Sequence, residues 1–191
     1  MQLIKVCMRV LLVVLLFISF EIAAQQHPYG IKVGGNVANL AGDGTDDLSS
    51  LINFQAGFYM EIELTKDVKV QPELLFTVYG FELSEGDNPN VRLNYVVLPV
   101  IVKYFVSNAF SFDAGPQVGL LVTAKNGTGS NADVKSDFFD RDFGVNLGAS
   151  YAISSKIAAS LRYYLGLTDV TSAETKNQNR AFQLAFQFKI K

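Results

Sequence analysis

The feature that most constrains the fold is a long run of strictly alternating residues. Between residues 52 and 64 every second side chain is apolar, and the positions between carry Asn, Gln, Gly, Tyr and Glu. Because strand side chains point alternately to two faces, this run predicts one strand with an apolar face and a polar face. Ordinary soluble strands are about half as long, whereas about 12 tilted residues cross the apolar layer of an outer membrane.

The same alternation recurs along the chain and predicts eight strands. The expected ranges are 29–38, 52–64, 68–79, 92–106, 110–123, 141–153, 156–168 and 180–190. The run 92–106 is apolar on both faces, and we place Tyr95 and Lys103 on its interior side. No linker, internal repeat or low-complexity tract interrupts the pattern, so a single domain over residues 25–191 is expected.

Short and long connections alternate between these strands. Those after the second, fourth and sixth strands have two or three residues, and the others, rich in Gly, Asp, Asn and Ser, cover 39–51, 81–91, 124–140 and 169–179. Transmembrane barrels have short periplasmic turns at one rim and long extracellular loops at the other. The expected fold is therefore all-β, an eight-stranded antiparallel up-and-down transmembrane barrel.

The first 24 residues have the three parts of a cleaved export signal. Lys5 and Arg9 come first, an apolar run over 10–20 follows them, and the small residues Ala23 and Ala24 follow that run. The run is shorter than the roughly 18 residues that span a bilayer as a helix. The only cysteine, Cys7, lies in this signal, so the exported chain is expected to have no disulfide.

Alternation alone also fits a soluble, lipocalin-like barrel with an apolar interior, and glycine distinguishes the two. Inside a narrow barrel glycine makes room for neighbouring side chains, whereas on a solvated strand it only weakens pairing. The polar face is therefore predicted to be the interior and the apolar face to meet lipid. The glycines on the polar face are Gly34, Gly57, Gly115, Gly119, Gly144, Gly148 and Gly166. The large aromatic residues expected outside are Phe54, Phe58, Phe76, Phe112, Phe143, Tyr151, Tyr163 and Phe182.

Several segments also resemble a known family. They are YGIKVGGNVANL near the start, VQPELLFTVYG at 70–80, LNYVVLPVIVKY at 93–104, FDAGPQVG at 112–119, DFGVNLGASY at 142–151 and RYYLGLTDV at 162–170. Together they are similar to the small outer-membrane β-barrel family of Bacteroidota, often labelled PorT-like. The resemblance implies an outer-membrane location in such a bacterium and, through PorT, a link to a secretion apparatus. The chain departs from such barrels at its end, because Lys189, Ile190 and Lys191 follow the last aromatic residue.

The predicted interior carries equal numbers of acids and bases. Buried charges must be paired, so we expect a salt-bridge network that fills the lumen, with a narrow ion path as the alternative. The residues of this predicted network are Lys32, Glu61, Glu63, Lys69, Glu73, Lys103, Asp113, Asp142, Arg162 and Lys189.

The long connections are rich in acidic residues. One expectation is that these side chains are simply solvated. The alternative is that cations bridge them to lipopolysaccharide phosphates or to a partner. The segment after residue 42 lacks the glycine and the final glutamate of an EF-hand loop. The candidate contact residues are Asp43, Asp46, Asp47, Glu82, Glu85 and Asp87.

The sequence argues against catalysis. The only histidine, His27, follows the signal directly, and no catalytic, cofactor-binding or metal-binding set is predicted. We expect a binding or scaffold barrel in the outer membrane; the alternatives are a narrow transport pore and a soluble periplasmic ligand-binding barrel. Expected partners are outer-membrane lipid, lipopolysaccharide and an envelope or secretion-apparatus protein. A net charge of −2 gives no basis for nucleic acid, and a monomer is expected.

Overall fold

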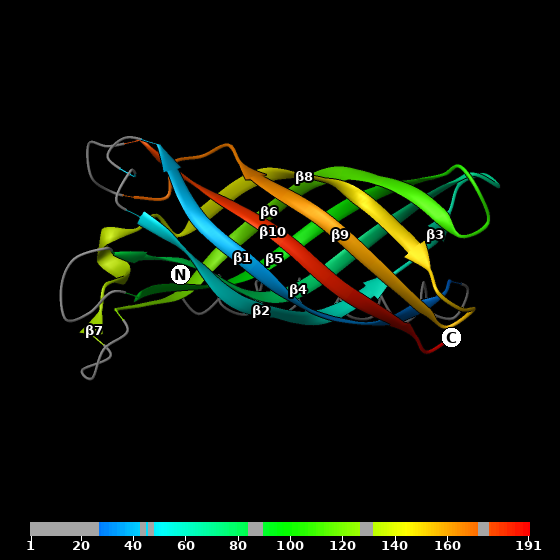
Figure 1. Ribbon diagram of the computed structural model, residues 1–191, viewed down its shortest axis with the longest axis horizontal. Helices are drawn as coiled ribbons and strands as arrows, with labels where there is room; N and C mark the ends of the chain where they lie inside the picture. The colour runs from blue at the N-terminus through cyan, green and yellow to red at the C-terminus, as the bar shows by residue number, and fades with distance from the viewer. Residues whose placement is uncertain (1–26, 43–44, 46–47, 84–89, 127–131, 172–175) are drawn as a thin grey trace, which may run out of the picture.

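The computed structural model describes residues 27–42, 45, 48–83, 90–126, 132–171 and 176–191 (Figure 1). The predicted export signal over 1–24 lies outside these residues. Among the described residues, no helix is long and apolar enough to cross a membrane.

Eight long antiparallel strands of the described chain form a closed barrel, which confirms the predicted fold (Figure 1). The order β2-β1-β10-β9-β8-β6-β5-β4 is closed by pairing between β2 and β4. The short β3 (Ile62–Glu63) pairs with β4, β7 (Ala132–Asp133) pairs with β6, and one 3₁₀ turn, η1 (Lys135–Asp137), follows β7. The barrel strands are β1 (Tyr29–Gly42), β2 (Leu48–Met60), β4 (Val68–Leu83), β5 (Asn90–Phe105), β6 (Phe110–Asn126), β8 (Arg141–Ala152), β9 (Ile157–Gly166) and β10 (Asn177–Lys189).

Short turns lie at one end of the barrel and the long connections at the other (Figure 1). The strands continue further toward the long connections than predicted, because pairing persists there: Gly42 opposes Asn177, and Asn126 opposes Val91. The predicted connections 39–51, 81–91 and 124–140 are therefore too long. We call the two rims the short-turn end and the loop end.

Burial alternates along the strands, with apolar side chains outside and, in the half of the lumen toward the short-turn end, mainly polar side chains inside. This inverts the arrangement of a soluble barrel and matches a surface in contact with lipid. Tyr95 and Lys103, on the strand that is apolar on both faces, both point inward. The most exposed large apolar side chains on the strands include Ile52, Phe54, Phe58, Phe112, Leu120, Tyr151, Leu161 and Phe182.

Two β-bulges interrupt the alternation near the loop end. In β2 the register with β4 shifts between Ser50 and Gln55, and in β6 it shifts opposite Asn94 and Tyr95. The first bulge is held from inside the lumen, where the Asn36 amide nitrogen donates to the Phe54 carbonyl at 3.3 Å. A bulge changes the face to which the following side chains point. In a regular strand, residues three positions apart point to opposite faces. Because the second bulge lies between Leu121 and Ala124, both of these side chains point inward.

The glycines of the inner face permit close approach between strands. A methyl group on Gly34 would overlap the Leu184 carbonyl and the Ala185 backbone, and one on Gly148 would overlap the Leu161 carbonyl and Arg162. The adjacent Gly35 points outward and has space for a methyl group. The inner glycines thus accommodate the neighbouring backbone as well as charged side chains.

Candidate functional site

Toward the short-turn end, the lumen holds a layer of four paired charges from four strands. Arg162 on β9 donates through Nη1 to Glu73 Oε1 on β4 at 2.7 Å, and through Nη2 to Asp113 Oδ2 on β6 at 3.1 Å. Lys32 on β1 donates to the second oxygen of Glu73 at 2.9 Å. All four side chains are at most 3% exposed. We call these residues the charge layer.

Neutral donors complete the coordination of both carboxylates. The Ser111 and Ser150 hydroxyls donate to Asp113 at 3.0 and 2.6 Å, and the Gln71 amide donates to Glu73 at 2.5 Å. Buried ion pairs offset their desolvation cost only when such additional bonds are made. The arrangement is therefore a fixed cross-brace of the barrel and leaves no free carboxylate oxygen in this layer.

A cluster of three tyrosines fills the lumen on the loop side of the charge layer. The Tyr79 ring stacks on Tyr164 with centroids 5.5 Å apart and lies 5.7 Å from Tyr95. The Tyr79 hydroxyl accepts hydrogen bonds from Gln117 at 3.0 Å and Gln183 at 3.2 Å. All three rings are fully buried, so they occlude the lumen here.

Asp142 lies beside this tyrosine cluster and apart from the charge layer. Its Oδ2 accepts a hydrogen bond from the Asn179 amide at 2.8 Å, and the same amide also donates to Tyr95 at 3.4 Å. Its carboxylate makes no ion pair with a described residue within 4.0 Å. The prediction that Asp142 joins the paired charges is wrong, because Asp142 lies closer to the loop end of the lumen than the charge layer does.

The loop end of the lumen is filled by apolar side chains, which the sequence analysis missed. Val91, Leu93 and Val97, on the inner face of β5, belong to this apolar cap, and the apolar character of both faces of 92–106 indicated it in the sequence. Val170, beyond β9, is also fully buried in it. The remaining members include Leu40, Phe81, Leu121, Ala124 and Ala181.

Other residues of the predicted network lie at the short-turn end. Lys69 and Glu61 form a partly exposed pair at 3.3 Å. Glu63 is exposed and Lys189 is half-buried, so neither belongs to the buried network as predicted. The reason is that β2 ends at Met60 and the β3–β4 hairpin extends to the rim, where side chains meet solvent.

Lys103 is the remaining buried base of the predicted set. It is 2% exposed, and its Nζ donates to the neutral Gln71 Oε1 at 3.3 Å. Asp113, directly opposite it in the strand register, bonds Arg162 and two serines.

The structure describes only one of the predicted acidic contact residues. Glu82 lies within β4, opposite Asn90 and Ser49, and is not in a loop as predicted, because β4 remains paired on both sides as far as Glu82. Asp43, Asp46, Asp47, Glu85 and Asp87 lie outside the described residues.

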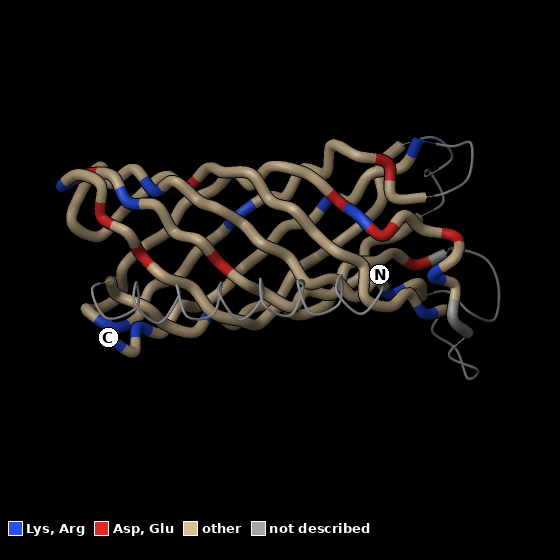
Figure 2. Tube along the Cα trace, turned by 180° about the vertical axis from the view of Figure 1, so that it is seen from behind, with Lys and Arg blue, Asp and Glu red and all other residues tan. Residues whose placement is uncertain are grey.

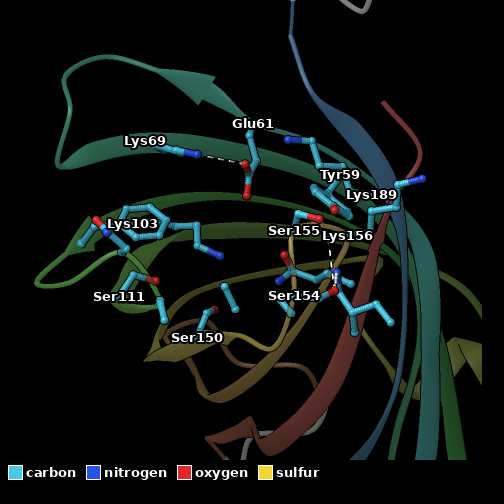
Figure 3. Close-up of a pocket in the computed structure, with 17 residues that line it drawn as sticks. Tyr59, Glu61, Lys69, Lys103, Ser111, Ser150, Ser154, Ser155, Lys156 and Lys189 are labelled. Carbon is cyan, nitrogen blue, oxygen red and sulfur yellow. Dashed lines mark hydrogen bonds and ion pairs between the residues drawn. The ribbon is translucent and has the colours of Figure 1, made fainter.

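A cavity of about 370 Å³ opens at the short-turn end (Figure 3). Lys69 and Glu61 form one wall, Ser111 and Ser150 lie opposite, and Lys103 lies between them (Figure 3). We call this cavity the vestibule. His27, just before β1, is half-buried and does not line it. No group of three metal-ligating side chains occurs among the described residues.

A closed barrel of eight strands with an apolar exterior, a charged and filled interior and alternating short and long connections defines a small outer-membrane β-barrel protein. Residues 23–172 match the family described as outer membrane protein beta-barrel domain, and the chain belongs to that family. Comparison with curated proteins gives no sequence match.

Solved barrels share this fold at low sequence identity. Neisserial surface protein A (NspA) is 13% identical with a TM-score of 0.60, over 85% of this chain and 97% of that chain. Ail, the attachment invasion locus protein of Yersinia pestis, is 14% identical with a TM-score of 0.53, over 86% of this chain and 99% of that chain. The family match and the apolar exterior of the closed barrel support an outer-membrane location for this chain.

Proposed function

We propose that this protein is a closed outer-membrane barrel that acts by binding, presenting its loop end to an envelope component or partner protein. The observation that carries the proposal is the filled lumen. The charge layer, the tyrosine cluster and the apolar cap follow one another along the axis and fill the described lumen beyond the vestibule. An eight-stranded barrel is just wide enough to be filled in this way, which disfavours a pore.

The acidic connections supply the chemistry of the proposed contact. Asp43, Asp46 and Asp47 follow β1, and Glu85 and Asp87 follow β4. Carboxylates at an extracellular rim attract basic partner surfaces directly and lipopolysaccharide phosphates through bridging divalent cations.

Site-specific photo-crosslinking in intact cells tests this role. A photoreactive residue replaces Lys125, exposed at the loop end, and in a matched control it replaces Ser154, exposed in a short turn. We expect a discrete adduct from position 125 that is lost when the five carboxylates above are changed to amides. Absence of any adduct at 125, or the same adduct from 154, would contradict the proposal.

A further inference from the structure

The vestibule has an excess of positive charge. Lys69, Lys103, Lys156 and Lys189 line it, and Glu61 is its one acidic lining residue among the described residues. Figure 2 shows several basic residues at the end of the barrel that holds the C-terminus. Glu63 and Asp67 line an adjoining depression with Lys66, and Lys69 lines both hollows.

Lys103 is the group that most requires a negative partner. It is almost completely buried and lies within 4.0 Å of no described carboxylate oxygen. A buried ammonium without a counter-charge is costly. Its one hydrogen bond is to the neutral Gln71, and the bonds of Asp113 go to Arg162, Ser111 and Ser150.

Gln187 provides a second, independent indication. This residue of β10 is 2% exposed and lines the vestibule, and its amide nitrogen has no hydrogen-bond partner among the residues that the structure describes. Buried donors in native proteins are almost always paired. The Gln187 amide donor and the Lys103 ammonium, which has no ion pair with a described residue, line the same cavity, and one anionic acceptor satisfies both.

The rim adds further donors. Ser154 Oγ accepts bonds from the backbone amides of Lys156 and Ile157 at 3.3 and 3.1 Å, which leaves its hydroxyl proton available. The Lys156 and Lys189 ammonium groups make no ion pair with a described residue. Lysines around a small concavity are a common arrangement for binding phosphate.

We propose that the vestibule binds a phosphate-type oxyanion from the periplasmic side, either free or as the headgroup of an inner-leaflet lipid. Lys103 and Gln187 contact the anion at the inner end, and Lys69, Lys156 and Lys189 surround it. A volume of about 370 Å³ is sufficient for one phosphate-bearing headgroup. This site is independent of the role proposed for the loop end.

The test is a titration of the full barrel in phosphatidylcholine nanodiscs with inorganic phosphate, followed by calorimetry and by amide shifts at Lys103 and Gln187. In a second arm, the nanodiscs contain phosphatidylglycerol and the buffer contains no phosphate. Saturable binding or these amide shifts in either arm supports the site. A response to inorganic phosphate identifies the free anion as the ligand, and a response to phosphatidylglycerol identifies the lipid headgroup. No response in both arms overturns the proposal.

Matched variants distinguish this site from general charge attraction. Lys103→Gln is expected to weaken binding about tenfold, as for loss of one charged hydrogen bond, whereas Lys125→Gln at the opposite end leaves it unchanged. Equal binding by Lys103→Gln and wild type, or equal weakening by Lys125→Gln, overturns the proposal. Should Lys103→Gln fail to fold, the double variant Lys156→Gln/Lys189→Gln at the rim takes its place, with the same expected direction and the same contrary result.

Discussion

Arg162 of β9 reaches across the lumen to Glu73 of β4, with 2.7 Å between Nη1 and Oε1. These strands are not neighbours in the barrel, so the pair braces opposite walls. Arg162 also holds Asp113 of β6, and Glu73 also holds Lys32 of β1. One arginine thus connects three walls.

Removing this arginine leaves two buried carboxylates with fewer partners. We expect Arg162→Met to lower the free energy of unfolding by about 3–5 kcal/mol, the usual cost of breaking a buried pair from one side. Urea titration in lipid vesicles, followed by far-ultraviolet circular dichroism, measures it. Arg92→Met, at an exposed position on β5, is the control, with an expected change within about 0.5 kcal/mol. Equal losses in both variants would show that the charge layer does not brace the barrel.

Tyr79 combines ring packing with two accepted hydrogen bonds, and two substitutions separate these contributions. Tyr79→Phe keeps the ring but leaves Gln117 and Gln183 without their acceptor, so we expect a loss of about 1–3 kcal/mol. Tyr79→Ala also empties the stack and is expected to cost about 3–5 kcal/mol. The same urea titration measures both, and indistinguishable variants would contradict the packed tyrosine cluster.

Adjacent glycines provide a test of the inner face. Gly34→Ala places a methyl group against the backbone of β10, and we expect a loss of about 1–3 kcal/mol. Gly35→Ala points outward into open space and is expected to be neutral or stabilising. The folded fraction, read from heat-modifiable migration on unboiled gels, compares the pair. A larger effect at Gly35 would mean that the faces are reversed.

The apolar exterior predicts a penalty for charge that depends on depth. Leu161 lies near the middle of β9, and we expect Leu161→Arg to cost about 2–4 kcal/mol in a bilayer. Ile190, beyond the end of β10 at the short-turn rim, is the matched position, and Ile190→Arg is expected to cost at most about 1 kcal/mol. Unfolding titrations in vesicles compare the two. Equal and small costs would place this surface in water.

The number of strands, and the face of each strand that points into the lumen, follow from local sequence patterns and were predictable. The alternation around Phe54 and Phe58 identifies β2 and its outer face, and the inner glycines identify the lumen. The bulge in β2 and its end at Met60 were not predictable, because both depend on the register with β4. For that reason Glu63 was wrongly placed inside the barrel.

The contacts of the lumen depend on relationships across the barrel that local sequence does not encode. Counting inward charges predicted that Lys32, Glu73, Asp113 and Arg162 would be buried together, and the structure brings these four into contact. The same count does not reveal that Asp142 lies at another depth or that Lys103 lacks a carboxylate. Depth and distance across the lumen are set by strand tilt and stagger, which follow only from closure of the barrel.

The central claim is that the lumen is closed, and electrical recording in planar lipid bilayers tests it most directly. The protein, folded in detergent with insertion verified by protease protection, is compared with a general porin under the same salt and voltage. We predict no steady conductance from this barrel, because the charge layer, the tyrosine cluster and the apolar cap all occlude the axis. Stable, ohmic single-channel steps from the wild-type protein would contradict the account.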